Sequence, residues 1–222
     1  MKRRHFLQAS AGAGAVAATH ATHAASGADA VARAGKRHAH DTAFEWLEAP
    51  ASQLLAAMAE GRSSSLALTR AYSARIAALD AAGPRLASVL ELNPDAEALA
   101  TQLDAERAAG RLRGPLHGLP VLIKDNIATA DRMATTAGSP ALLGITPPRD
   151  AAVVARLRAA GALLLGKTNL SEWANFRGKN SISGWSTRGG QTRNPYALDR
   201  SPSGSSSGTD AALAANFASL GV

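Results

Sequence analysis

The stretch GLPVLIK at residues 118–124 decides the fold class of this 222-residue chain. Its apolar core is short and bounded by turn residues, which is typical of a buried strand. A second apolar run, ALLL at residues 162–165, ends at Gly166 and predicts another strand. Segments with a helical period precede, separate and follow these strands. Strands that alternate with helices predict an α/β layered fold with a partly parallel sheet.

The helical segments mostly begin at side chains that can cap a helix. Ser, Asn and Asp accept hydrogen bonds from the free N–H groups of a first helical turn. Apolar residues at helical spacing, such as Leu68, Tyr72 and Ile76, indicate the buried face of one such segment. The expected helices are residues 65–82, capped by Ser63 or Ser64, residues 94–109, capped by Asn93, residues 150–160, capped by Asp150, residues 169–176, capped by Asn169, and Thr209–Ser219.

Lys124 ends the first strand, and two interpretations of it are open. In the first, its stem packs on the core and its ammonium group reaches water. In the second, it lies in a dry pocket, where burial lowers its pKa and makes a neutral amine available as a general base near pH 7. The second interpretation gains weight if a cluster of hydroxyl groups lies nearby in space.

The loop RSPSGSSSGTD at residues 200–210 is the densest cluster of hydroxyls and glycines in the chain. A slack linker is disfavoured because a helical segment follows the loop directly. A Gly/Ser turn before a helix can form a concave nest of backbone N–H groups that suits phosphate or an oxyanion. The loop lacks the order of a nucleotide P-loop. A nucleophilic hydroxyl site remains, with Gly204, Ser206 and Ser207 as candidate substrate-binding residues.

From Phe44 to Val222 the chain resembles the amidase signature family, and most closely its bacterial peptide-amidase-like members. The matching segments occur in the order and spacing of the family. They are RGPLHGLPVLIKDNI (113–127), TTAGSPAL (135–142), DAAVVARLRAAGALLLGKTNLSEWANF (150–176), SGWSTRGGQTRNPYALDRSPSGSSSG (183–208) and AALAANF (211–217).

This resemblance implies an α/β/α sandwich with a mixed sheet and a catalytic Ser–Ser–Lys triad. The lysine of the triad corresponds to Lys124, and the bridging serine, whose preceding peptide bond is cis in the family, corresponds to Ser205. The implied reaction hydrolyses a carboxamide to a carboxylate and ammonia. Its substrate would be a small amide or an amidated peptide, and no metal or organic cofactor is implied.

The chain departs from the family pattern in two places. Asp210 stands where the family has a small residue at the start of a helix, although an acid is electrostatically favourable there. The position of the nucleophilic serine falls beyond Val222. We therefore expect residues 44–222 to be the N-terminal part of an amidase domain, incomplete at its C-terminus and inactive alone.

Two other functions remain open at this stage. In the first, the chain is an inactive fragment or an anion-binding module that uses the Gly/Ser nest at residues 203–208. In the second, it is an amidotransferase-type subunit. An export signal at the N-terminus argues against the amidotransferase-type subunit, since such a subunit acts in the cytoplasm.

The N-terminus has the order of charges and apolar residues that is typical of an export signal. Arg3 and Arg4 precede His5-Phe6-Leu7 and a weakly apolar run, which resembles a twin-arginine signal. We expect residues 1–30 to be a signal peptide, residues 31–43 to be a spacer, and the product to be periplasmic or secreted. The export machinery is then the expected partner, and the run is too short and polar for a stable membrane span.

Composition excludes several other functions. Hydrophobic residues make up 46% and charged residues 18% of the chain, as in a globular protein. The net charge of +7 is scattered without a dense Lys/Arg block, so we expect no nucleic-acid partner. The chain has no cysteine, which excludes disulfides and thiolate sites. Its six histidines do not fall in ligand spacing, so no metal is expected.

Overall fold

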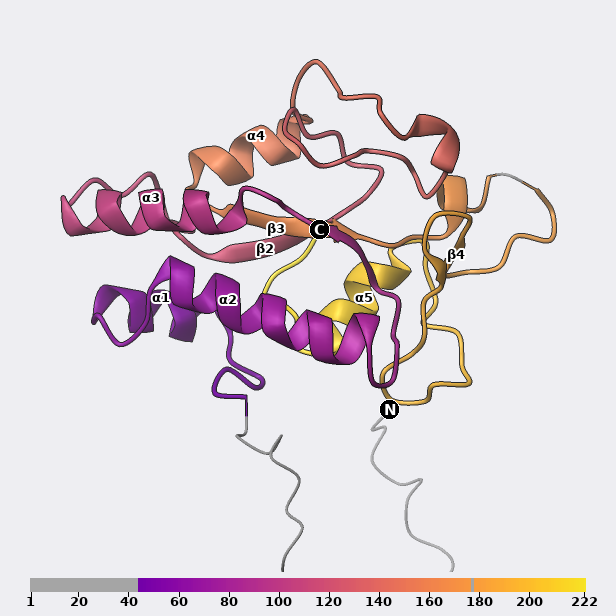
Figure 1. Cartoon of the computed structure of the whole chain (residues 1–222), viewed down its shortest axis with the longest axis horizontal. Helices are drawn as coiled ribbons and strands as arrows, with labels where there is room; N and C mark the ends of the chain where they lie inside the picture. The colour runs from indigo at the N-terminus through magenta and orange to yellow at the C-terminus, as the bar shows by residue number, and fades with distance from the viewer. Residues whose placement is uncertain (1–43, 177) are drawn as a thin grey trace, which may run out of the picture. The chain divides into compact units, whose positions relative to one another are not determined.

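Three strands, β1 (Val89–Leu92), β3 (Leu163–Thr168) and β2 (Pro120–Lys124), lie side by side in that order (Figure 1). Strand β2 pairs with β3 in the parallel direction, whereas β1 pairs with β3 in the antiparallel direction. The sheet is therefore mixed, as predicted. Both strands predicted from their apolar runs are present, and β1 is the strand of this sheet that the sequence did not reveal.

This arrangement comes from a computed structural model that describes residues 44–176 and 178–222. The expected signal peptide over residues 1–30 and the expected spacer over residues 31–43 lie outside the described residues. Phe44–Val222 forms one unit with its own core. Within the described residues, no helix has the length and apolar character needed to cross a membrane.

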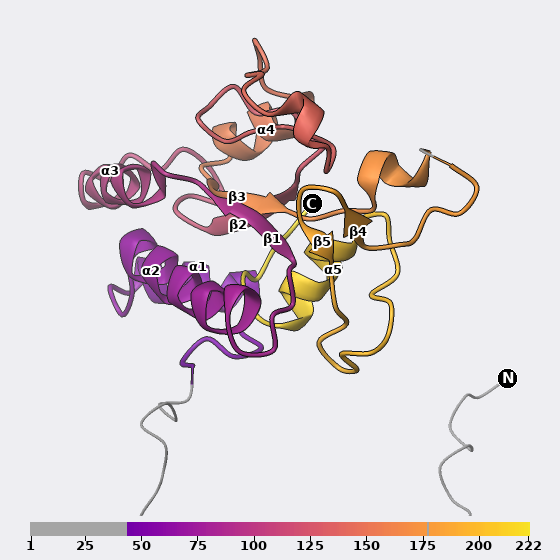
Figure 2. The same ribbon diagram turned by 45° about the vertical axis from the view of Figure 1, so that its right-hand side comes forward.

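Helices cover both faces of the sheet (Figures 1 and 2). Leu122, Leu163 and Leu165 point to one face and pack with residues of α1 (Ala51–Ala59), α2 (Ser65–Ile76), α3 (Ala96–Ala108) and α5 (Ser207–Ala214). Val121, Ile123 and Leu164 point to the opposite face and pack with Val154 of α4 (Ala152–Ala159). Alternate strand residues thus feed two cores, which confirms the predicted α/β/α sandwich.

The remaining elements are short. They are the π-helical turn η1 (Ala77–Ala81), the 3₁₀ turns η2 (Pro140–Leu142) and η3 (Glu172–Asn175), and the hairpin strands β4 (Trp185–Ser186) and β5 (Gly190–Gln191). Figure 2 shows the β4–β5 hairpin beside α5.

The prediction that strand β3 ends at Gly166 was wrong. The strand continues to Thr168 because Gly166 lies at close approach to the neighbouring strand: a Cβ atom there would lie 2.6 Å from the carbonyl oxygen of Glu91. The glycine therefore serves sheet packing rather than chain reversal. As a consequence, Lys167 is carried into the interior.

The last residues of the chain extend the sheet at the free edge of β2. The backbone N–H of Val222 donates to the carbonyl of Leu122 at 3.0 Å, and that of Lys124 donates to the carbonyl of Val222 at 2.7 Å. Leu122 and Gly221 form a parallel bridge. Residues 220–222 therefore run beside the strand that carries Lys124.

Of two predicted caps, Ser64 was right and Asn93 was wrong. The hydroxyl of Ser64 accepts the N–H of Ala67 at 3.0 Å and caps α2. Helix α3 begins at Ala96 with Asp95 as its N-cap residue and no side-chain cap, because the side chain of Asn93 accepts the N–H of Asp95 at 2.9 Å in the turn before the helix.

The predicted cap Asp150 was wrong because the side chain has partners elsewhere. Helix α4 begins at Ala152 without a side-chain cap. The Asp150 carboxylate accepts the N–H of Ala130 at 2.8 Å and the Nε–H of Arg158 at 2.9 Å. It therefore fastens the segment that follows β2 to helix α4.

The predicted helix over residues 169–176 was also wrong. Asn169 is fully buried, and its amide donates to the carbonyl of Ala87 at 3.2 Å and to the hydroxyl of Thr192 at 3.0 Å. Only the turn η3 follows, with Trp173 and Ala174 at positive φ. The last helix likewise differs, since α5 covers Ser207–Ala214 instead of Thr209–Ser219.

Candidate active site

The candidate site lies where the end of β2 meets the loop before α5. Lys124 is the last residue of β2, so its backbone is held in the sheet while its side chain extends past the strand. The residue is half-buried. Its Nζ donates to Oγ of Ser205 at 2.7 Å across 81 positions of sequence. The predicted proximity of these two side chains is confirmed, and the peptide bond between Gly204 and Ser205 is cis.

Small residues let the loop fold tightly around Ser205. A Cβ atom on Gly204 would lie 2.4 Å from Oγ of Ser207 and 2.7 Å from Oγ of Ser171. The hydroxyl of Ser207 donates to the carbonyl of Ser203 at 2.5 Å, so it closes the loop on itself. Of the candidate substrate-binding residues, Ser207 and Gly204 thus have packing roles in the loop.

The first turn of α5 is held against the sheet by close backbone contact. The N–H of Gly208 donates to the carbonyl of Asn169 at 2.9 Å, and a Cβ atom on Gly208 would lie 2.4 Å from that oxygen. The hydroxyls of Thr168 and Thr209 lie 2.7 Å apart and join the end of β3 to the helix. Ser206 is the N-cap residue and is half-buried. A substrate contact from Ser206 remains a prediction.

Two opposing effects act on the pKa of Lys124. Burial lowers the pKa of Lys124 from its ordinary value, and the negative charge of Asp210 opposes that change by raising it. The net direction is downward. Asp210 is exposed in the first turn of α5. The residue that departs from the family pattern therefore acts directly on the lysine of the site.

A second lysine, Lys167 on β3, is fully buried and was not predicted as part of the site. Its Nζ donates to the carbonyl of Ile127 at 2.7 Å and to the hydroxyl of Thr135 at 2.9 Å. Burial is the main cause that lowers its pKa to about 8. The available signal was a lysine directly after the apolar run of a buried strand, and the mistaken end at Gly166 concealed it.

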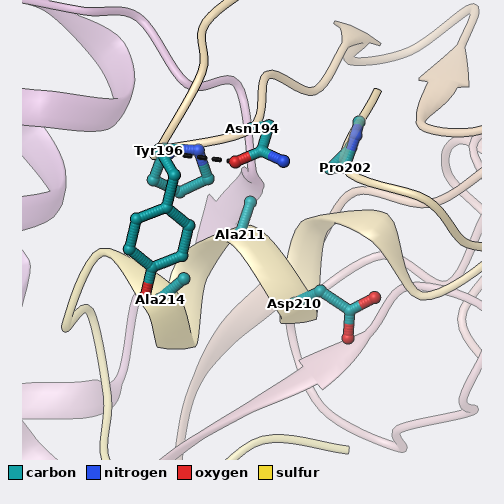
Figure 3. A pocket seen from close by; sticks show the side chains of 7 residues that line it. Asn194, Tyr196, Pro202, Asp210, Ala211 and Ala214 are labelled. Atoms are coloured by element: carbon teal, nitrogen blue, oxygen red, sulfur yellow. Dashed lines mark hydrogen bonds between the residues drawn. The ribbon is translucent and has the colours of Figure 1, made fainter. Parts of the chain in front are cut away.

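A small open pocket lies between α5 and the segment before the serine-rich loop (Figure 3). Asn194 and Tyr196 line it from the segment, where the N–H of Tyr196 donates to the side chain of Asn194 at 2.9 Å. Asp210, Ala211 and Ala214 line it from the helix. Neither Lys124 nor Ser205 is among its lining residues, so the pocket adjoins the candidate site without containing it.

Two families match separate parts of the chain. The Amidase family matches residues 67–222, and the twin-arginine translocation pathway signal sequence matches residues 1–20. The N-terminal match indicates export across a membrane.

Several relatives share this part of the chain. A peptide amidase from Stenotrophomonas maltophilia is 61% identical, superposes with a TM-score of 0.78, and is matched over 80% of this chain and 36% of that one. A protein of Arabidopsis thaliana named as an amidase is 46% identical over 181 residues, which cover 81% of this chain and 35% of the relative.

A glutamyl-tRNA(Gln) amidotransferase subunit of Thermobifida fusca is 45% identical over 178 residues, which cover 79% of this chain and 34% of the relative. The chain thus spans about a third of the length of these three relatives. The family match covers well over half of the chain. On this evidence, the chain belongs to the amidase signature family.

Proposed function

We propose that this chain provides the lysine and the bridging serine of an amidase that hydrolyses a carboxamide to a carboxylate and ammonia. The observation that carries the proposal is the 2.7 Å contact between Nζ of Lys124 and Oγ of Ser205. The lowered pKa of Lys124 supports it, because a general base must be neutral near the working pH.

The proposed reaction uses a Ser–Ser–Lys triad whose nucleophilic serine lies beyond Val222. Neutral Lys124 accepts the hydroxyl proton of Ser205 as Ser205 accepts the proton of the nucleophile. The nucleophile attacks the amide carbonyl carbon, and collapse of the tetrahedral adduct breaks the C–N bond while the relay returns the proton to the departing NH2 group, which leaves as ammonia. Water then hydrolyses the acyl-enzyme through the same relay and releases the carboxylate. The steps require neither a metal nor an organic cofactor.

An amidated peptide is the substrate class that we favour. The relative at 61% identity is a peptide amidase, and a peptide carboxamide presents the same carbonyl group to the relay. The N-terminal match further supports a periplasmic or secreted location. In that location, extracellular amides and peptides would be the accessible substrates.

A chimera tests the proposal. Residues 44–222 replace the matching segment of the Stenotrophomonas maltophilia peptide amidase, which supplies the remaining part of the fold. We expect ammonia release from amidated peptides, a loss of roughly 10³-fold in kcat/KM for Ser205→Ala, and none for the control Ser201→Ala in the same loop. The 222-residue chain alone should release no ammonia. A chimera that folds without turnover, or a Ser205→Ala variant as active as its parent, contradicts the proposal.

An amidotransferase-type subunit is the second candidate, favoured by the similarity to the glutamyl-tRNA(Gln) amidotransferase of Thermobifida fusca. It would use the same relay to release ammonia for transfer within a larger assembly. Glutamine as the preferred substrate of the chimera, over any amidated peptide, would favour this function. An anion-binding module at residues 203–208 would instead bind phosphate without turnover. An inactive fragment would show no turnover.

The export signal has its own test. Twin-arginine transport depends on the arginine pair, so replacement of both Arg3 and Arg4 by lysine should keep the product in the cytoplasm. Cell fractionation with antibody detection measures this. Continued export of the double variant contradicts a twin-arginine signal over residues 1–30.

A further inference from the structure

The residue after Lys124 is an acid with no exposed side-chain surface. Oδ2 of Asp125 accepts the N–H of Thr136 at 3.2 Å and the N–H of Gly138 at 3.0 Å. Oδ1 accepts Nη1–H of Arg188 at 3.0 Å. Burial raises the pKa of the Asp125 carboxyl, and the hydrogen bonds from Thr136 and Gly138 oppose that rise. The charged form of Asp125 is thus stabilised by these hydrogen bonds.

Arg188 lies between β4 and β5 and is largely buried, with 13% of its side chain exposed. Its second terminal nitrogen pairs with Glu91 on β1. Its backbone N–H donates to the carbonyl of Gly138 at 2.9 Å. One guanidinium therefore joins the carboxylate of Glu91 on β1 to that of Asp125 just after β2. A lysine has one nitrogen and cannot pair with both carboxylates in this forked geometry.

The same hairpin supports the loop that carries Ser205. The hydroxyl of Ser171 accepts the N–H of Gly184, which precedes β4, at 2.9 Å. The N–H of Ser171 donates to the carbonyl of Ser205 at 3.0 Å. Both partners of the 2.7 Å contact are thus tied to one hairpin, Lys124 through the neighbouring Asp125 and Ser205 through Ser171.

We propose that the Asp125–Arg188 ion pair is a positioning device that holds the Lys124 amine against Ser205. The inference rests on the proposed amidase function and assigns no contact with substrate to either residue. Removing one partner of a buried ion pair leaves an uncompensated charge, which drives rearrangement or protonation. At Asp125 this rearrangement occurs one residue from the general base, where a displacement of about 1 Å costs on the order of 10²-fold in rate.

The first test follows the Lys124 amine in the 222-residue chain. Lysine labelled with ¹³C at Cε gives an NMR resonance for Lys124, assigned by its loss in Lys124→Arg. We expect Arg188→Gln to move this resonance toward that of the exposed Lys179. The matched control is Arg132→Gln, which removes the exposed ion pair with Asp95 from the same segment after β2, and it should leave the resonance in place.

The second test measures kinetics in the chimera with the peptide amidase. Arg188→Gln should lower kcat by roughly 10- to 100-fold with KM changed less than about threefold, because the pair positions the base and not the substrate. Arg188→Lys should recover part of the loss. The double variant Asp125→Asn/Arg188→Gln should also have a higher kcat than Arg188→Gln, since it leaves no unpaired charge beside Lys124, and Glu91, the other partner of Arg188, keeps 24% of its side chain exposed to water.

Thermal unfolding identifies variants that fail to fold, and Thr136→Val then replaces Arg188→Gln. It removes one hydroxyl donor of Asp125 and should move the Lys124 resonance by a smaller amount in the same direction. An unchanged resonance in a folded variant overturns the positioning role, and so does an equal loss of kcat in Arg132→Gln. A chimera without any turnover refutes the amidase function instead, and the resonance still decides the positioning role.

Discussion

Lys124 and Lys167 lie on the neighbouring parallel strands β2 and β3, and burial lowers the pKa of both. Lys167 is fully buried, has a pKa of about 8, and donates to the carbonyl of Ile127 and the hydroxyl of Thr135. Lys124 is only half-buried and donates to Ser205 in a loop of small residues. A lowered pKa alone therefore does not distinguish a candidate base from a structural lysine.

What separates the two lysines is their exposure and the loop that supplies the hydroxyl partner. Lys167 is fully buried and holds the segment after β2 through the carbonyl of Ile127, which cannot pass on a proton, and through the hydroxyl of Thr135. A serine hydroxyl both donates and accepts, so the contact of Lys124 with Ser205 can carry a proton in either direction.

The largest effect is expected on activity. In the chimera, Lys124→Met should lower kcat/KM by roughly 10³-fold because the general base is lost, while the unfolding temperature changes little. Lys179→Met, at an exposed position, is the control and should retain full activity. The assay is ammonia release from an amidated peptide, and retention of a tenth of the activity in Lys124→Met would exclude Lys124 as the base.

The next effect is on stability and falls on the other lysine. Lys167→Ala should lower the free energy of unfolding by about 3 kcal/mol, because it leaves a cavity and removes the donor of two partly buried acceptors. Lys124→Ala should cost less than about 1 kcal/mol, since its amine is half-exposed. Urea unfolding measures both, and a larger loss for Lys124→Ala would reverse the comparison.

The pH dependence of stability gives a finer distinction. Between about pH 8 and the ordinary lysine pKa, the unfolded chain binds a proton at Lys167 that the folded chain does not. Stability should therefore rise with pH in this window, by about 1.4 kcal/mol per pH unit from this group. Lys167→Met should lack this contribution, and parallel stability curves for the two proteins would contradict it.

The measurement is urea unfolding at several pH values below 10. The upper bound is set by Tyr72, because burial raises its pKa to about 12 and its ionisation in the unfolded chain would act in the opposite direction.

The smallest effect concerns Asp210. Its negative charge raises the pKa of Lys124, so Asp210→Asn should lower that pKa further. The acidic limb of the pH profile of kcat/KM in the chimera, where the base becomes protonated, should then move to lower pH. Asp199→Asn, which removes a well-exposed acid, should leave the profile in place. A shift to higher pH would show that Asp210 does not act through its charge on Lys124.

Local patterns were sufficient for much of the fold. Apolar runs predicted β2 and β3, and helical spacing with the Ser64 cap predicted α2. The prediction that Lys124 meets Ser205 came from resemblance to a family, since nothing in either segment specifies a partner 81 residues away. The catalytic roles of the two residues stay predictions.

The errors at Asp150 and Asn169 share one cause, which is competition from distant partners. Asp150 has the chemistry of a helix cap, and its carboxylate nevertheless pairs with Arg158 and the segment after β2. Asn169 was expected to start a helix, yet its buried amide binds Ala87 before β1 and Thr192 after β5. Capping rules describe one helix end, whereas a buried polar group binds whichever donor or acceptor the packing brings to it.

The sequence by itself determined the layered α/β class, the placement of Lys124 at a strand end and the dense cluster of small hydroxyl residues, because these depend on periodicity and side-chain size. Only the tertiary structure decided that Gly166 continues a strand, that Lys167 is buried, and that Arg188 joins Asp125 to Glu91. The physical reason is that burial and charge pairing are set by contacts between segments distant in sequence, and local propensity carries no information about which segments will meet.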